Sequence, residues 1–207
     1  MSKDTIVNSC KSYKKIIIEI GSGDGRLLSN IANLYDRNQA FLLGVEIDNA
    51  QYIDSCNRIK EEVKSKNIQF INEPFENILA NFEDNSIDTV ISVLPHPKYI
   101  DRTNQDVWIP IYKNILDKLK EYGYFLLVTE LIDELLQPVS KIDYNLWKNW
   151  LLETFSTIGF RIFKVIDDDV PLYITSHYLD KFRNDPERIK IISLLMTKNK
   201  NNNNFSL

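Results

Sequence analysis

The stretch IIIEIGSGDGRLL, residues Ile16 to Leu28, sets three isoleucines and a glutamate ahead of three glycines spaced among small polar residues. The apolar run predicts a buried strand, and the leucines after the last glycine begin an amphipathic helix. Glycine permits a tight turn and lets a ligand approach the main chain closely. In a doubly wound α/β sheet, the turn after the first strand lies where ligands bind. The stretch therefore predicts both a fold and a site.

The rest of the chain repeats this alternation of apolar runs and amphipathic segments, which is typical of a parallel sheet covered by helices on both faces. We expect Gly123 to form a turn that opens the fifth strand, Gly159 to end the last helix, and the final strand to enter without a crossover helix. The fold class is α/β, a doubly wound, seven-stranded, Rossmann-like sheet. The expected strands span residues 14–20, 41–47, 67–71, 86–94, 122–130, 160–166 and 188–198, and the helices 25–35, 49–66, 75–82, 108–120 and 144–158.

Size and composition predict one domain over residues 1–198, followed by a disordered, asparagine-rich tail at 199–207. The chain has 25 basic and 29 acidic residues, which excludes a protein that coats nucleic acid through a large positive charge. No apolar run is long enough to span a membrane, and the start lacks a secretory signal, so we expect a cytoplasmic protein. The chain has two cysteines and two histidines, Cys10, Cys56, His96 and His177. Their spacing is not that of metal ligands, so no metal site is expected.

Carboxylates surround the glycine turn and decide what it binds. Glu46 ends the second expected strand about 20 residues past the last glycine, where an acid accepts the hydroxyls of a ribose. Glu19 precedes the turn and Asp24 lies within it, so the pyrophosphate of a dinucleotide would meet negative charge. The sulfonium and ammonium of S-adenosylmethionine would instead be attracted. The charges favour S-adenosylmethionine over a dinucleotide, and over a glycine turn that binds nothing.

The motifs E-I-G-S-G-D-G and G-V-E-I resemble those of class I S-adenosylmethionine-dependent methyltransferases. The resemblance implies the strand order 3-2-1-4-5-7-6, with the seventh strand antiparallel. It also implies that the glycine motif lines the methionine end of the cofactor, that Glu46 holds the ribose, and that a polar residue after the third strand lies near the adenine. The cofactor-binding residues so implied are Glu19, Gly21, Ser22, Gly23, Gly25, Glu46, Ile47, Leu94, and either Asn72 or Glu73.

A narrower resemblance follows from ISVLPHPKYIDR and SHYLDKF, which are similar to acceptor-side elements of the tRNA (guanine-N7) methyltransferase family. It implies RNA, in particular tRNA, as the partner. That family has an acid between the two prolines, where this chain has His96, and a basic cluster of which Lys98 and Arg102 remain. His96 is the candidate catalytic residue, or else a turn residue in a rigid corner. The candidate substrate-binding residues are Lys98, Arg102, Ser176 and Tyr178.

Three functions stay open at this point. The first is RNA methylation of the guanine-N7 type. The second is methylation of a small molecule, ribosomal RNA or protein, which the acidic balance permits. The third is a cofactor-binding subunit without catalysis. The remaining lysines and arginines are expected on a solvated face. Four aromatic residues have the spacing of a helical core rather than of a base-stacking surface: Trp108, Tyr112, Trp147 and Trp150.

Overall fold

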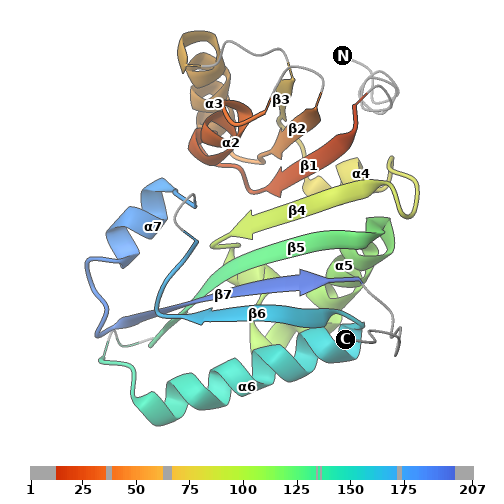
Figure 1. Cartoon of the computed structure of the whole chain (residues 1–207). Helices are drawn as coiled ribbons and strands as arrows, with labels where there is room; N and C mark the ends of the chain where they lie inside the picture. Colours follow the sequence, from red (N-terminus) through yellow and green to blue (C-terminus); the bar gives the residue numbers. More distant parts are fainter. Residues whose placement is uncertain are drawn as a thin grey trace, which may run out of the picture.

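A computed structural model describes residues 13–35, 39–62, 67–133, 135, 137–171 and 174–198. The seven strands form one sheet in the order β3-β2-β1-β4-β5-β7-β6 (Figure 1). Strands β1 to β5 run parallel to one another, and β7 is antiparallel to both β5 and β6. The predicted strand order and the antiparallel seventh strand are confirmed. The strands are β1 (Lys15–Ile20), β2 (Ala40–Val45), β3 (Ile68–Ile71), β4 (Ile87–Val93), β5 (Leu119–Ile132), β6 (Arg161–Asp167) and β7 (Ile189–Thr197).

Helices cover both faces of the sheet, as the alternating pattern predicts. Apolar side chains of α2, α3 and α7 pack on one face, and those of α4, α5 and α6 pack on the other. Two short 3-10 helices, η1 (Pro97–Tyr99) and η2 (Arg102–Asn104), follow β4. The helices are α2 (Arg26–Ala32), α3 (Asn49–Glu62), α4 (Phe75–Leu79), α5 (Gln105–Lys118), α6 (Lys141–Ile158) and α7 (His177–Phe182).

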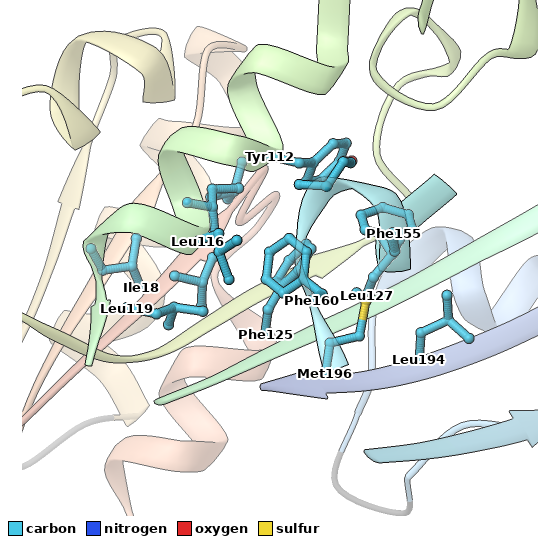
Figure 2. Close-up of a cluster of buried hydrophobic side chains, with 14 of the residues drawn as sticks. Ile18, Tyr112, Leu116, Leu119, Phe125, Leu127, Phe155, Phe160, Leu194 and Met196 are labelled. Atoms are coloured by element: carbon cyan, nitrogen blue, oxygen red, sulfur yellow. The ribbon is translucent and has the colours of Figure 1, made fainter. Parts of the chain in front are cut away.

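The core between α5, α6 and the sheet is rich in aromatic rings. Phe125 of β5 and Phe155 of α6 are fully buried, and Tyr112 of α5 packs edge-on against Phe155 with ring centroids 5.0 Å apart (Figure 2). Trp108 is also fully buried, and it contacts Trp150 of α6 edge-on. The prediction that these aromatic residues belong to the core is confirmed for Trp108, Tyr112 and Trp147, whereas Trp150 is only partly buried.

Two local predictions are wrong. Gly123 does not open β5: the strand starts at Leu119, and Gly123 lies at an irregularity in its pairing with β4, where an added Cβ would meet the carbonyl oxygens of Ile87 and Asp88 at 3.1 Å. A bulge, rather than a turn, needs the glycine there. A short helix, α7, lies between β6 and β7, although β7 is antiparallel and needs no crossover. The predicted asparagine-rich tail, residues 199–207, and the first 12 residues lie outside the described residues.

Candidate active site

A pocket of about 530 Å³ opens at the carboxyl ends of the parallel strands. Because these ends share one edge of the sheet, the loops after β1, β2, β3 and β4 meet there, and α7 adds one side. The position matches the prediction from the glycine turn. Its lining comprises residues 19–24, Leu27, residues 45–48, Gln51, residues 73–75, residues 92–97, Tyr99, Tyr112, Ile115, Glu130, residues 175–178 and Phe182.

The glycine turn between β1 and α2 has the left-handed backbone that its sequence predicts. Gly21, Gly23 and Gly25 have φ angles of 68°, 53° and 74°. The amides of Gly21 and Ser22 both donate to the carbonyl oxygen of Val45, at 2.9 and 3.1 Å, and so fasten the turn to β2. A Cβ at Gly21 would meet no atom within 4 Å, so backbone conformation alone requires glycine there.

Gly25 has a different role from the other two glycines. It does not line the pocket. A Cβ on Gly25 would lie 2.6 Å from Cζ of Phe70 and 2.7 Å from Cβ of Ser55. Gly25 therefore allows β3 and α3 to pack closely against the start of α2, and it supports the site from behind.

Glu46 joins the end of β2 to the glycine turn. One carboxylate oxygen accepts from the Gly23 amide at 2.8 Å, and the other accepts from the Asp48 amide at 2.8 Å. The side chain is 8% exposed and lines the pocket. Each carboxylate oxygen can accept a further hydrogen bond, so a ligand hydroxyl can still bind there.

Glu19 is the most deeply buried acid of the pocket. It is 3% exposed, and its Oε2 has no hydrogen-bond partner among the residues that the structure describes. Burial, together with the nearby carboxylates of Asp24 and Glu46, raises the pKa of Glu19 well above its usual value. A buried carboxylate without a partner is costly unless a ligand pairs with it. A positively charged ligand would provide that partner.

Asp24 behaves differently from the sequence interpretation, which counted it as a free negative charge. Its carboxylate pairs with Arg26 of α2 at 3.3 Å and with Arg58 of α3 at 3.0 Å. Arg58 also donates from Nε to the Asp24 carbonyl oxygen at 3.0 Å. These two cations offset the charge of Asp24. The preference of the site for a cation therefore depends mainly on Glu19.

The structure separates Asn72 from Glu73, between which the sequence left a choice. The Asn72 amide donates to the carbonyl oxygens of Glu46 and Ile47, at 2.9 and 3.0 Å, and so holds the loop after β2. Asn72 does not line the pocket, whereas Glu73 does. Ile47 is 63% exposed and also lines it.

The segment after β4 carries Leu94, a cofactor-binding candidate, and His96, the catalytic candidate. Leu94 lines the pocket with a left-handed backbone, φ 52°, which is costly for a leucine. Nδ1 of His96 accepts from the Lys98 amide at 3.2 Å and caps η1. A neutral imidazole in this position carries its proton on Nε2. His96 thus forms a turn, as its interpretation as a turn residue predicts. It also lines the pocket, as a catalytic residue would.

The four candidate substrate-binding residues lie in different places. Ser176 and Tyr178 line the pocket, where Ser176 also caps α7 by accepting from the Leu179 amide at 3.1 Å. Lys98 lines no described pocket, and its Nζ lies 4.5 Å from the Tyr99 ring centroid. Arg102 lines a neighbouring groove instead.

Glu130, near the end of β5, is a site residue that the sequence reasoning missed. It lines the pocket, and its Oε2 has no partner among the described residues. Burial raises the pKa of Glu130 to about 7. The signal was present: VTE ends an expected strand, and parallel strands end at the same edge of the sheet. His177 of α7 also lines the pocket and was missed, because no helix was expected there.

The residues that line the pocket fit S-adenosylmethionine. Glu19 offers a buried carboxylate oxygen without a partner among the described residues to a cation, and Glu46 offers acceptors to hydroxyls. The described parts of the chain hold no group of three or more potential metal ligands and no helix long and apolar enough to cross a membrane.

Comparison with known proteins agrees with this geometry. The sequence matches the family described as "Methyltransferase domain" over residues 11–189, and the chain therefore belongs to that family. No curated protein sequence matches the chain.

Similar solved structures share the fold. A 16S rRNA methyltransferase, KamB, is 12% identical with a TM-score of 0.72, covering 97% of this chain and 95% of its own. An antibiotic-related methyltransferase is 20% identical with a TM-score of 0.68, covering 94% of both chains. Geranyl diphosphate C-methyltransferase from Streptomyces coelicolor A3(2) is 10% identical with a TM-score of 0.60, covering 95% of this chain and 79% of its own.

Proposed function

We propose that this methyltransferase-family protein uses S-adenosylmethionine to methylate a base of RNA, and that N7 of a tRNA guanine is the first position to test. One observation carries the proposal. A single pocket holds two carboxylates, Glu19 on β1 and Glu130 on β5, and each has a buried oxygen without a partner among the described residues. When bound, S-adenosylmethionine supplies an activated methyl group on a sulfonium.

The cofactor half of the pocket is built from β1, β2 and their loops. Glu19 attracts the positive charge of the methionine end, and Glu46 accepts hydrogen bonds from the ribose hydroxyls. Gly21, Ser22 and Gly23 let that end approach the main chain, while Ile47 and Glu73 line the adenine side. The alignment of donor and acceptor is the main contribution that such a site makes.

The acceptor half uses the segment after β4, Glu130 and α7. Guanine has N–H donors on the edge away from N7, and Glu130 can accept from them and so direct N7 toward the methyl group. This assigns to Glu130 the orienting role that the resemblance places between the two prolines, where His96 stands. His96 and Ser176 contact the acceptor from the rim. The N7 lone pair needs no prior deprotonation, so the residues orient the base rather than remove a proton.

Incubation with methyl-labelled S-adenosylmethionine tests the function. Purified protein would be mixed with separated tRNA, ribosomal RNA and small-molecule fractions, followed by nucleoside analysis. The proposal predicts label in tRNA as 7-methylguanosine, and loss of most of it with Glu130→Ala. Glu121→Ala is a suitable control, because Glu121 is exposed on β5 and lines neither pocket. Label in another RNA base would keep RNA as the substrate and replace guanine N7 as the methylated position. Tight S-adenosylhomocysteine binding without transfer would indicate a binding subunit.

A small-molecule acceptor is the second candidate, and one observation favours it. Acidic residues lie around the acceptor side, including Asp101 and Asp143 in the neighbouring groove, with Arg102 as the only cation that lines either described pocket. RNA binding usually depends on several phosphate contacts. Label found only in the small-molecule fraction would select this candidate.

A further inference from the structure

A groove of about 440 Å³ adjoins the pocket. It lies between the η1–η2 segment, the end of β5 and α6. Pro97 and Glu130 line both the pocket and the groove, so a ligand that contacts Glu130 in the pocket can extend directly into the groove. Its lining residues are Pro97, Ile100, Asp101, Arg102, residues 130–132, Asp143, Leu146, Trp147 and Trp150.

The groove contains a fixed planar layer. The guanidinium carbon of Arg102 lies 4.9 Å from the Trp150 ring centroid, and Nη2 donates to the Leu146 carbonyl oxygen at 3.0 Å. Trp150 in turn contacts the buried Trp108 edge-on at 6.0 Å. Trp108 donates from Nε1 to the Asp101 carbonyl oxygen at 2.7 Å and so fixes the loop that carries Arg102. Arginine planes and aromatic rings are surfaces on which unstacked RNA bases stack.

The charges of the groove favour a nucleoside over a phosphate. Asp101, Asp143 and Glu130 place three carboxyl groups against the single cation of Arg102. Asp101 uses Oδ1 to accept from the Thr103 amide at 2.6 Å, and Asp143 uses Oδ2 to accept from the Ser140 hydroxyl at 2.6 Å. Their remaining oxygens can accept from hydroxyls and from exocyclic amines. A phosphate in this groove would meet repulsion, whereas ribose hydroxyls and base N–H groups find acceptors.

We propose that this groove binds the nucleoside next to the methylated base, with its base stacked on the Arg102–Trp150 layer and its N–H and hydroxyl groups directed at the carboxylates. The inference rests on the proposed RNA substrate and adds to it. It makes the neighbouring base part of the recognised sequence, and it makes Arg102 a stacking plane instead of a phosphate contact.

Binding of short nucleotides to protein saturated with S-adenosylhomocysteine tests the inference. All three tryptophans of the chain line or underlie the groove, so their fluorescence reports on it. The affinities of the dinucleoside monophosphates GpA and ApG would be compared with that of guanosine 5′-monophosphate. We expect at least one of the two dinucleotides to bind about tenfold tighter, the gain that one stacked base provides. Equal affinities for all three would overturn the inference.

Substitutions at Arg102 separate stacking from charge. Arg102→Lys keeps the charge and loses the plane, so it should remove the dinucleotide gain while leaving the affinity for guanosine 5′-monophosphate within about twofold. Arg161→Lys on β6 is a matched control, because Arg161 is exposed and lines neither pocket. A gain that survives Arg102→Lys but is lost in Arg102→Gln would show a phosphate contact and contradict the proposal. Unchanged thermal unfolding of the variants excludes a folding defect.

Failure of the inference differs from failure of the proposed function. If tRNA is methylated and guanosine 5′-monophosphate binds, but dinucleotides gain nothing, only the groove assignment fails. If no nucleotide binds while spermidine quenches the fluorescence, the groove takes cations and the RNA acceptor fails with it. Binding of a peptide in place of nucleotides would likewise refute both the groove assignment and the RNA acceptor.

Discussion

At the scale of single residues, the site depends on two acids whose environment disfavours their charge. Glu19 is buried and Glu130 is half-buried, and loss of solvation is the largest cause of each raised pKa. Sequence could locate Glu19 because it adjoins the glycine motif, but it could not show that Asp24 is paired with two arginines. Such pairing depends on side chains from α2 and α3 that come together only in the folded protein. Carboxylates kept without partners in a pocket are typical of functional sites.

Glu130 should make stability depend on pH. Its pKa is raised from 4.5 to about 7, so the folded protein holds the proton more tightly than the unfolded chain does. That contribution to stability is complete below about pH 4.5 and is lost as the pH rises through 7. Relative to Glu130→Gln, the wild-type free energy of unfolding should fall by about 2 kcal/mol between about pH 5 and pH 8. Urea denaturation at several pH values measures this. A constant difference between the two proteins would show that Glu130 is not buried as described.

At the scale of elements, the glycine turn offers a pair of substitutions that share strain and differ in packing. Gly25→Ala places Cβ against Phe70 and Ser55, whereas Gly21→Ala meets open space. Both residues have positive φ, so each change costs about 1 kcal/mol for backbone strain, and Gly25→Ala should lose about 2 kcal/mol more from overpacking. Urea denaturation of the two variants measures the difference. Equal losses would mean that β3 and α3 do not approach Gly25 closely.

Helix α7 is tied to the glycine turn by Arg26. Arg26 pairs with Asp24 through Nη2 and with Asp180 of α7 through Nη1, at 3.3 and 3.1 Å. Because α7 lines the pocket, the ion pairs of Arg26 connect the glycine turn on one side of the pocket to α7 on the other. Asp180→Asn should therefore speed amide hydrogen exchange in residues 177–182 by about two- to fivefold, the effect of a weak exposed ion pair.

Asp117→Asn provides the control for Asp180→Asn, because it removes a comparable exposed pair with Lys113 on α5. It should leave exchange in α7 unchanged. If Asp180→Asn also left it unchanged, the ion pair would have no part in holding α7.

The sequence predicted regular elements better than their irregularities. Long apolar runs such as those of β1, β4 and β7 are read from composition, because a buried strand needs little else. The bulge at Gly123 and the six-residue α7 depend on contacts with other strands and loops, so local pattern could not distinguish them from turns. The same limit explains why the sequence could not decide whether Asn72 or Glu73 faces the pocket, because that depends on the contacts of Asn72 with the loop after β2.

At the scale of the whole molecule, the strand order brings distant residues to one pocket. Distant parts of the chain supply the pocket with Glu19 and Glu130 from strands and with Glu46 and Ser176 from the loops beside β2 and α7, and the shared edge of the sheet gathers them. The family and the cofactor follow from the early motifs, which is why sequence could predict them. The acceptor does not, because the residues around the outer part of the pocket and the neighbouring groove come from η1, η2, α6 and α7, which only folding brings together.

Calorimetric titration of the protein with S-adenosylmethionine, and separately with NAD⁺, tests the central claim that the buried Glu19, whose Oε2 has no partner among the described residues, selects a cationic ligand. Binding of a cation lowers the raised pKa of Glu19, so S-adenosylmethionine should bind with proton release. Proton release should make the measured binding enthalpy depend on the ionisation enthalpy of the buffer. This dependence should vanish in Glu19→Gln, which should also bind S-adenosylmethionine at least about tenfold more weakly. NAD⁺ should show no binding. Tight NAD⁺ binding, with S-adenosylmethionine excluded or bound equally well by Glu19→Gln, would contradict the account.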